Sequence, residues 1–374
     1  MDILAELNPA QRKAAEVVNG PVLILAGPGS GKTRVITHRI AYLIKVCGIS
    51  PRRIMAVTFT NKAAREMEER LKKLAAGAVK DITMGTFHAI CVRILRQDGR
   101  AIGVQPGFVI YDRDDQLSLV KRCLKEMELD PRLHAPAAVL SAISNAKSQV
   151  ITPPEYNQRA KGYFEETVSR IYEKYQQSLE QNNALDFDDL LMKTVQLFNS
   201  HPEILERYQQ RYLHIMVDEF QDTNLVQYRL VKQLAGAYRN ICVVGDPDQS
   251  IYSWRSADMR NILNFEKDYP EASVVLLEQN YRSTRTILET ASGIISANKK
   301  RKHKELWTEN EKGELVSIIE KYNQQEEAQF VVREVERLLE QGKANLSDCA
   351  VMYRTNAQSR ALEETLSAMA RPTS

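Results

Sequence analysis

A glycine-rich loop placed directly after an apolar run constrains this chain more than any other feature of its 374 residues. The apolar run covers residues 21–26, and the loop reads AGPGSGKT, which fits GxxxxGK[ST] with Gly27, Gly31, Lys32 and Thr33 in the fixed places. Glycines let the backbone wrap around phosphate groups, and the positive end of the following helix favours an anion there. Apolar residues at helical spacing follow the loop, as the motif requires. The pattern predicts a nucleotide triphosphate site, whereas a glycine-rich turn with an incidental lysine is the alternative.

Four further apolar runs have the length of buried parallel strands, and each is followed directly by a polar segment. Ligands of an open α/β sheet bind beyond the carboxyl ends of the strands. We therefore expect an α/β fold in which these segments share one edge and form one composite site. The five expected strands are Pro21–Ala26, Ile54–Phe59, Leu213–Val217, Ile241–Val244 and Val274–Leu277.

The amino-acid composition excludes only a few classes of protein and binding site. The formal net charge of +3 is too small to indicate nucleic-acid binding by bulk electrostatics, so such binding must rest on local sites. The five cysteines show no CxxC spacing, which argues against a zinc site or a disulfide framework. The amino terminus lacks a signal-peptide core, and no apolar stretch is long enough to span a bilayer. We expect a soluble cytoplasmic protein without a membrane partner.

Two adjacent carboxylates, Asp218 and Glu219, end one of the expected strands in the sequence VDEFQD. Neighbouring strand residues point to opposite faces, so the two cannot easily share one role. Asp218 is the better magnesium partner, facing Thr33, whereas Glu219 is placed to take a proton from an attacking water. An acidic turn at a strand end is the alternative interpretation.

Gln249 and Arg282 complete the set of residues that we expect around the phosphates. Gln249, in GDPDQS, suits sensing of a γ-phosphate or orientation of water, although it could be an ordinary loop glutamine. Arg282, in QNYRST, could offer its guanidinium to the γ-phosphate as an arginine finger, or form an interdomain salt bridge instead. We therefore predict Lys32, Glu219, Gln249 and Arg282 as the catalytic residues.

The chain also shows a change of pattern along its length. From Arg96 to Asn183 the strand signal disappears and helical periodicity replaces it, which predicts an α-helical insertion. Residues 96–180 contain 12 Lys/Arg and 12 Asp/Glu, so this insertion is not a basic DNA-gripping arm. We interpret the basic run at 299–304 as a solvated loop. Beyond Arg282 we expect helices ending near 297 and covering 325–339, and strands near 315–319 and 349–353.

Eight segments resemble, in order, the motifs of superfamily 1 DNA helicases of the UvrD/PcrA/Rep type. They are LNPAQRKAA, AGPGSGKT, TFTNKAAREM, GTFHAICVRIL, VDEFQD, GDPDQSIYSWRSA, LEQNYRST and YRTNAQSR. The resemblance covers nearly all of the chain. It implies a RecA-like P-loop NTPase parallel sheet with an α-helical insertion and the start of a second RecA-like domain. The expected limits are 1–95 and 184–281 for the first domain, 96–183 for the insertion and 282–374 for the incomplete second domain.

The resemblance further assigns the nucleotide contacts. It implies that Gln11 reads the adenine edge and that Tyr281 stacks on the adenine face, with ATP and Mg²⁺ as cofactors. Thr33 and Asp218 are the expected magnesium ligands. The full set of expected ATP contacts is Gln11, Gly27, Gly29, Ser30, Gly31, Lys32, Thr33, Arg34, Tyr281 and Arg282.

The same resemblance implies a single-stranded DNA path at the strand ends. Bases can stack on aromatic rings without sequence preference while polar groups follow the phosphates. An aromatic residue taken alone is more often part of a core, but these positions match the base-contacting positions of the family. We interpret His88 as a hydrogen-bonding residue rather than a metal ligand. The expected contacts are Phe59, Thr60, Asn61, Thr86, His88, Phe187, Tyr252, Trp254, Arg255 and Asn356.

The function implied is that of an ATP-dependent DNA helicase or translocase that moves 3′ to 5′ and unwinds duplex. Single-stranded DNA, junctions with duplex, and proteins of DNA repair or replication are the implied partners. Family members continue after YRTNAQSR with more of the second motor domain, so we expect that domain to be incomplete at Ser374. A non-catalytic ATP- and DNA-binding module is therefore the alternative function.

Overall fold

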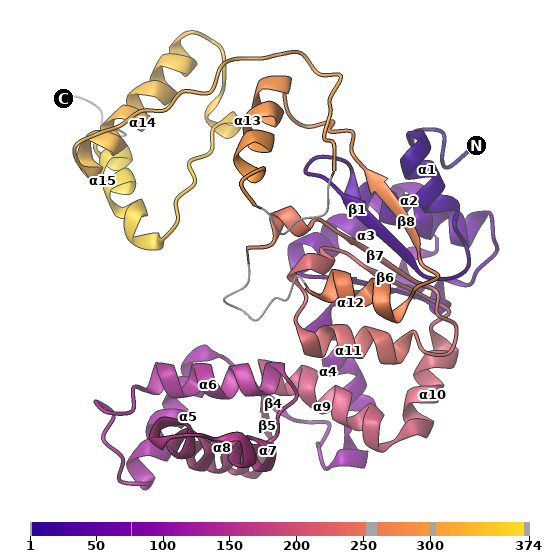
Figure 1. The fold of residues 1–374 in the computed structure, drawn as a ribbon, viewed down its shortest axis with the longest axis vertical. Coiled ribbons are helices and arrows are strands. Elements are labelled where there is room, and N and C mark those ends of the chain that lie inside the picture. Colours follow the sequence, from indigo (N-terminus) through magenta and orange to yellow (C-terminus); the bar gives the residue numbers. More distant parts are fainter. Residues whose placement is uncertain (1, 76, 252–259, 299–303, 370–374) are drawn as a thin grey trace. The chain divides into compact units, whose positions relative to one another are not determined.

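The computed structural model describes residues 2–75, 77–251, 260–298 and 304–369 (Figure 1). The chain divides into two compact units, Met1–Gly313 and Glu314–Ser374. The first unit contains the glycine-rich loop and most of the predicted site residues. Each unit is described by itself below.

The first unit is built on a six-stranded sheet in which all neighbouring strands are parallel. The strand order is β3-β2-β6-β7-β1-β8. The five expected strands are confirmed, whereas β3 is not evident from the sequence because its residues TMGT form no apolar run. The strands are β1 (Val22–Ala26), β2 (Ile54–Thr58), β3 (Thr83–Thr86), β6 (His214–Val217), β7 (Ile241–Gly245) and β8 (Ser273–Leu277).

Alternate residues of the central strands enter two separate hydrophobic cores, one on each face of the sheet. In β1, Leu23 and Leu25 belong to one core, whereas Val22 and Ile24 belong to the other. Helices must cover both faces of a sheet whose strands are buried on both sides, and this confirms the expected α/β fold. The core with Val22 includes residues of α1 (Pro9–Glu16), α2 (Lys32–Lys45) and α3 (Asn61–Ala75), and the core with Leu23 includes residues of α4 (Phe87–Asp98), α9 (Phe187–Ser200), α10 (Pro202–Arg211), α11 (Leu225–Leu234) and α12 (Arg260–Asp268).

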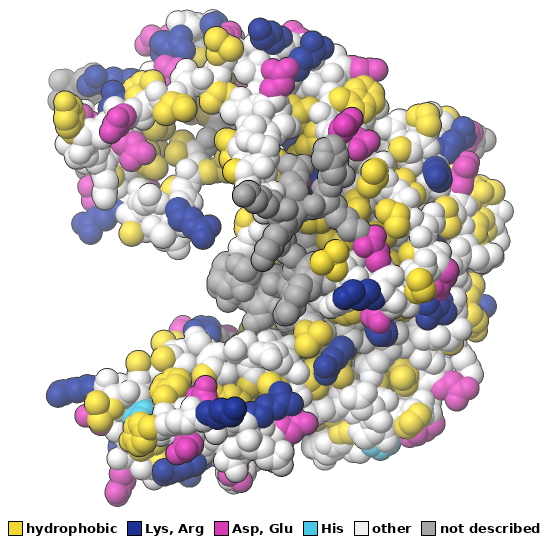
Figure 2. Space-filling model, in the orientation of Figure 1, with side chains coloured by type: hydrophobic (Ala, Val, Ile, Leu, Met, Phe, Trp, Pro, Cys, Tyr) yellow, Lys and Arg dark blue, Asp and Glu magenta, His cyan; other side chains and the backbone are white. Residues whose placement is uncertain are grey.

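The insertion is mainly helical and has its own hydrophobic core. It contains α5 (Arg113–Glu126), α6 (Pro136–Ser148), α7 (Pro153–Arg159) and α8 (Tyr163–Gln181). Basic and acidic side chains are interspersed over these helices (Figure 2). The expectation that no strand occurs here is wrong in one place, because β4 (Val109–Tyr111) pairs in parallel with β5 (Ala184–Asp186). Three residues are too few for a strand to stand out in the sequence.

Beyond β8, the first unit contains α13 (Arg285–Ile295), and the second unit contains α14 (Gln324–Glu340) and α15 (Ser359–Met369). Both predicted helices are confirmed. The strands expected near 315–319 and 349–353 are wrong, because the described residues of these segments have no strand pairing. An extended segment needs a partner to form a ladder. Within the described part of the chain, no helix combines the length and apolar character needed to cross a membrane. The expected domain limits stay a prediction.

A fully buried ion pair fastens the insertion to α9. The amine of Lys147, in α6, lies 2.7 Å from Asp186 Oδ2 and 2.9 Å from Asp189 Oδ1. The same two carboxylates cap the first turn of α9. Burial alone would lower the pKa of Lys147, but the carboxylates outweigh it and raise that pKa above its ordinary value. Because Phe187 is the first residue of α9, this cluster fixes the backbone from which its ring projects.

Lys147→Met should lower the free energy of unfolding by about 3–5 kcal/mol, because it leaves two buried carboxylates without their cation. Urea denaturation at neutral pH measures the change. Lys174→Met is the control, since Lys174 forms a surface pair with Glu126 and its loss should leave stability nearly unchanged. Equal effects of the two substitutions would contradict this interpretation of the buried cluster.

Candidate functional site: a phosphate-binding loop and an adjacent groove

The loop between β1 and α2 has the geometry of an anion cradle. Gly29 and Gly31 have φ of 64° and 87°, in the left-handed region that favours glycine. The Ser30 hydroxyl donates to the Gly27 carbonyl at 2.7 Å and closes the turn. Gly31 is the N-cap of α2 and provides no side-chain cap. The first N–H groups of the helix can therefore bind the oxygens of a phosphate.

Two polar contacts join this loop to the ends of neighbouring strands. Lys32 Nζ donates to Gln249 Oε1 at 2.9 Å, and the Thr33 hydroxyl lies 3.4 Å from Asp218 Oδ2. Asp218 directly follows β6, and Gln249 lies just beyond β7. The structure thus brings Lys32, Thr33, Asp218 and Gln249 together at one edge of the sheet. A hydroxyl and a carboxylate are the hard oxygen donors that Mg²⁺ prefers.

The two adjacent carboxylates differ in their surroundings. Asp218 is buried, and burial followed by the negative charge of Glu219 raises its pKa to about 6. Glu219 lies beyond the strand and has a φ of 49°, so its direction is set by this left-handed turn and not by strand alternation. Its Oε2 accepts from Gln221 Nε2 at 2.8 Å. Strand alternation was our reason for expecting different roles for Asp218 and Glu219, and it is wrong because Glu219 is not in the strand. The two side chains nevertheless contact different groups.

Gln11 and Tyr281, the expected adenine contacts, both lie against the loop. Gln11 is buried, and its Nε2 donates to the Ser30 carbonyl at 2.9 Å. The Tyr281 backbone N–H donates to the Gly29 carbonyl at 3.0 Å, while its ring is half exposed. Asn8 donates from Nδ2 to the Tyr281 hydroxyl at 2.7 Å. One side of the loop is thus bordered by a fixed amide and an accessible aromatic ring.

Arg282 is exposed, and its backbone is held by Asn280, a buried residue two positions earlier that we did not predict from the sequence. Asn280 donates from Nδ2 to the Pro28 carbonyl at 2.7 Å and accepts the Arg282 backbone N–H at 2.9 Å. Its place inside the QNYRST motif was the available signal. Arg34, another expected ATP contact, donates from Nη2 to the Glu6 carbonyl at 2.8 Å. Arg282 and the loop both belong to the first unit.

The basic run at 299–304 is not wholly a solvated loop. Lys304 is buried and forms ion pairs with Asp246 and Asp248. The neighbouring Leu306 lies against the loop, because a Cβ added to Gly27 would lie 2.2 Å from its Cδ2. The expectation for this run is therefore wrong at Lys304, and residues 299–303 lie outside the described part of the chain. A basic cluster in the sequence gives no signal that one member is buried.

A groove of about 970 Å³ lies between the strand ends and the insertion. Three expected DNA contacts line it, namely Phe59, His88 and Phe187. The rings of His88 and Phe187 meet edge to face at 5.7 Å, and Phe187 is 46% exposed. Burial lowers the pKa of His88, which favours its neutral form. Residues that the sequence analysis missed also line the groove, among them Arg113, Ser144, Asn145, Asp188, Asn224 and Gln227.

Of the other expected DNA contacts, the three that the structure describes in the first unit, Thr60, Asn61 and Thr86, do not line this groove. Thr60 accepts the Ala63 N–H at 3.1 Å, and Thr86 accepts the Ala89 N–H at 3.2 Å, so both hydroxyls stabilise helix starts. Asn61 is exposed at the start of α3. Asn356 belongs to the second unit. Tyr252, Trp254 and Arg255 lie outside the described residues.

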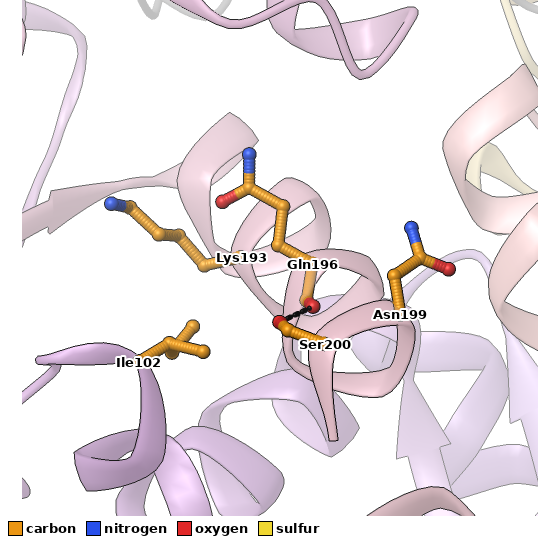
Figure 3. A pocket seen from close by; sticks show the side chains of 5 residues that line it. All are labelled: Ile102, Lys193, Gln196, Asn199 and Ser200. Atoms are coloured by element: carbon orange, nitrogen blue, oxygen red, sulfur yellow. Dashed lines mark hydrogen bonds between the residues drawn. The ribbon is translucent and has the colours of Figure 1, made fainter. Parts of the chain in front are cut away.

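A second pocket, of about 440 Å³, lies beside α9 (Figure 3). It contains none of the predicted site residues. Its lysine, Lys193, pairs with Glu180 at 3.2 Å, and Ser200 donates to the Gln196 carbonyl at 2.5 Å. These contacts account for the Lys193 amine and the Ser200 hydroxyl without a ligand. The lining residues are Ile102, Lys193, Gln196, Asn199 and Ser200.

Gly29→Ala should lower the free energy of unfolding by about 1–3 kcal/mol more than Gly20→Ala. Both glycines have positive φ, so both substitutions strain the backbone. Only at Gly29 would the new Cβ collide with other groups, at 2.7 Å from Asn280 Nδ2 and 2.8 Å from Arg282 Cβ, whereas space around Gly20 is open. Chemical denaturation of both variants measures the difference, and equal losses would show that the contact with 280–282 is unimportant.

Comparison with known proteins agrees with this geometry. A family model described as the UvrD/REP helicase N-terminal domain matches residues 7–270, and one described as the UvrD-like helicase C-terminal domain matches 275–373. The chain is 53% identical over 364 residues to the ATP-dependent DNA helicase PcrA of Bacillus subtilis, covering 97% of this chain and 49% of that protein. It is 51% identical to PcrA of Staphylococcus aureus, over 97% of this chain and 50% of that protein. The chain spans about half the length of these curated relatives. It belongs to the UvrD/REP helicase family.

Proposed function

We propose that this chain contributes ATP binding, ATP hydrolysis and single-stranded DNA binding to an ATP-dependent DNA helicase. One observation carries the proposal: the phosphate-binding loop and the aromatic groove occupy strand ends of the same parallel sheet. The loop follows β1, whereas Phe59 follows β2 and His88 lies just beyond β3. Nucleotide and DNA would therefore bind to adjoining segments of one rigid scaffold.

In this proposal the loop amides and Lys32 hold the phosphates, and Thr33 and Asp218 hold magnesium. Bound Mg²⁺ would neutralise the charge that develops between the phosphates during transfer to water. Gln11 would bind the adenine edge, and the accessible ring of Tyr281 would stack on its face. The contacts of Gln11 with the loop support this role, because they fix the amide beside the phosphate site.

Glu219 is the proposed proton acceptor for the attacking water. Its contact with Gln221 orients the carboxylate, and its place beside Asp218 sets it next to the magnesium site. Gln249 would orient water or bind the γ-phosphate from the other side of Lys32. Arg282 is exposed next to the loop and would stabilise the charge on the γ-phosphate.

Phe59 and Phe187 are the proposed stacking platforms for bases, and neutral His88 would donate or accept one hydrogen bond. Other residues remain proposed contacts to the same single strand of DNA, namely Thr60, Asn61, Thr86, Tyr252, Trp254, Arg255 and Asn356. We further infer that movement is 3′ to 5′ and that junctions of single-stranded and duplex DNA are the substrate. Proteins of DNA repair or replication are the proposed partners, and the cytoplasm, where ATP and DNA meet, is the proposed location.

The other candidate function is a non-catalytic ATP- and DNA-binding module. Segments 315–319 and 349–353 of the second unit have no strand partner among the described residues, which favours this module, because a second motor domain needs its own sheet. Turnover of ATP with and without single-stranded DNA separates the two. DNA-stimulated hydrolysis supports the motor, whereas tight ATP and DNA binding without hydrolysis supports the module.

Lys32→Ala should weaken ATP binding and abolish any hydrolysis, because it removes a charge-assisted contact to the phosphates. Isothermal titration of magnesium-ATP measures the affinity. Lys45→Ala is the matched control, since Lys45 is an exposed lysine at the far end of the same helix. Unchanged ATP affinity in Lys32→Ala would refute the nucleotide site.

Phe187→Ala should weaken binding of single-stranded DNA by about 1–3 kcal/mol, with little dependence on base sequence, because one stacking surface is lost. Fluorescence anisotropy with oligo-dT and a mixed sequence measures the affinity at one fixed salt concentration. Phe164→Ala is the control, because this phenylalanine is 41% exposed and lies outside the groove. If both variants bind DNA as the wild type does, the groove is not the DNA site.

A further inference from the structure

We propose that Lys304 is a positioning residue for the nucleotide site, acting through Asp246 on the loop that carries Gln249. The inference rests on the proposed function, since it concerns recognition of the third phosphate of ATP. Lys304 falls within the match to the C-terminal family model, whereas Asp246 and Gln249 fall within the match to the N-terminal model. One side chain thus connects two segments that the family models assign to different domains.

The ion pair between Lys304 and Asp246 is buried. The side chain of Lys304 is 1% exposed, and that of Asp246 is fully buried. Lys304 Nζ contacts Asp246 Oδ1 and lies 3.3 Å from Asp248 Oδ2. A buried ammonium is costly unless it is paired and hydrogen-bonded. The two carboxylates supply this pairing. The amine in turn neutralises part of the negative charge that these two acidic side chains place on one short loop.

The backbone around Lys304 is held independently of the ion pair. The Glu305 N–H donates to Glu278 Oε1 at 2.8 Å, and the Trp307 N–H donates to the Glu278 carbonyl at 3.1 Å. The Asn280 N–H returns a bond to the Trp307 carbonyl at 2.8 Å. These bonds align residues 305–307 with the segment after β8. Lys304 therefore approaches Asp246 from a fixed support.

Asp246 is connected to the glycine-rich loop by a chain of two hydrogen bonds. Its Oδ2 accepts from Gln249 Nε2 at 2.9 Å, and Gln249 Oε1 accepts from Lys32 Nζ at 2.9 Å. A carboxylate can only accept, so the amide nitrogen of Gln249 must face Asp246 and its oxygen must face Lys32. Asp246 and Lys32 thus set the orientation of the Gln249 amide, and Lys304 holds Asp246 in the position that this orientation requires.

A second branch leads from Asp246 to the proposed proton acceptor. The Asp246 N–H donates to Gln221 Oε1 at 2.9 Å, and Gln221 Nε2 donates to Glu219 Oε2 at 2.8 Å. Asp246 therefore joins two polar side chains that border the terminal-phosphate end of the site. Losing its cation would loosen both branches, while the amides that cradle the inner phosphates stay in place.

The test compares ATP and ADP affinities of the 374-residue chain, measured by isothermal titration with magnesium. Lys304→Met should weaken ATP binding about tenfold, the equivalent of one hydrogen bond to a charged group, and leave ADP binding nearly unchanged. The ratio of the ADP to the ATP dissociation constant then falls. Lys193→Met is the matched control, because Lys193 is a mostly buried lysine paired with Glu180 elsewhere in the first unit. Its ratio should equal that of the wild type.

Thermal melting of each variant shows whether it is folded. If Lys304→Met does not fold, Lys304→Gln is measured in its place, because it removes the charge but keeps an N–H donor for Asp246. A folded variant with the wild-type ratio overturns the inference while leaving the proposed function intact. An equal fall in ratio for Lys193→Met also overturns it, because the effect would then be general loosening. A wild-type chain that binds neither nucleotide overturns the proposed function and the inference together.

Discussion

Parallel alignment of the six strands is the constraint on which both candidate sites depend. Because every strand runs in the same direction, the segments that follow β1, β6 and β7 meet at one edge, where Lys32 contacts Gln249 and Thr33 approaches Asp218. The segments after β2 and β3 reach the same edge and contribute to the groove. In an antiparallel sheet, neighbouring strand ends would point to opposite edges and these groups would be separated. The order of strands thus sets which chemical groups become neighbours.

The glycines of the phosphate loop are constrained from outside as well as by the loop itself. A Cβ at Gly27 would lie 2.2 Å from Leu306, and one at Gly29 would lie 2.7 Å from Asn280. Both neighbours come from segments far along the chain. Close approach of other backbone and side chains is therefore a reason for glycine here in addition to the curvature around phosphate. The loop geometry depends on the polypeptide beyond β8, which itself is held to the strand end by backbone hydrogen bonds.

The sequence predicted the parts of this structure that depend on local pattern. Apolar runs of four to six residues marked five of the six strands, and the polar segments after them located Lys32, Asp218 and Gln249 at a shared edge. It could not show the burial of Lys304, because a lysine in a basic run has the same local pattern whether or not a distant carboxylate meets it. The prediction of strands failed in two places for a related reason. The unpredicted strand β3 forms beside β2, whereas the predicted strand at 315–319 has no neighbouring strand among the described residues. Pairing partners are a property of tertiary structure.

One short segment belongs to both candidate sites. Asp218 lies beside Thr33 of the glycine-rich loop, and Asp222, at the end of the same turn, lines the groove. Phe220, between them, is fully buried, and Gln221 is bonded to both Glu219 and the Asp246 N–H. A packed core resists small independent displacements, so a shift of Asp218 would move the groove wall with it. Coupling of this kind requires two discrete arrangements of the segment, and this segment contains one residue, Glu219, with a left-handed backbone conformation, at φ of 49°.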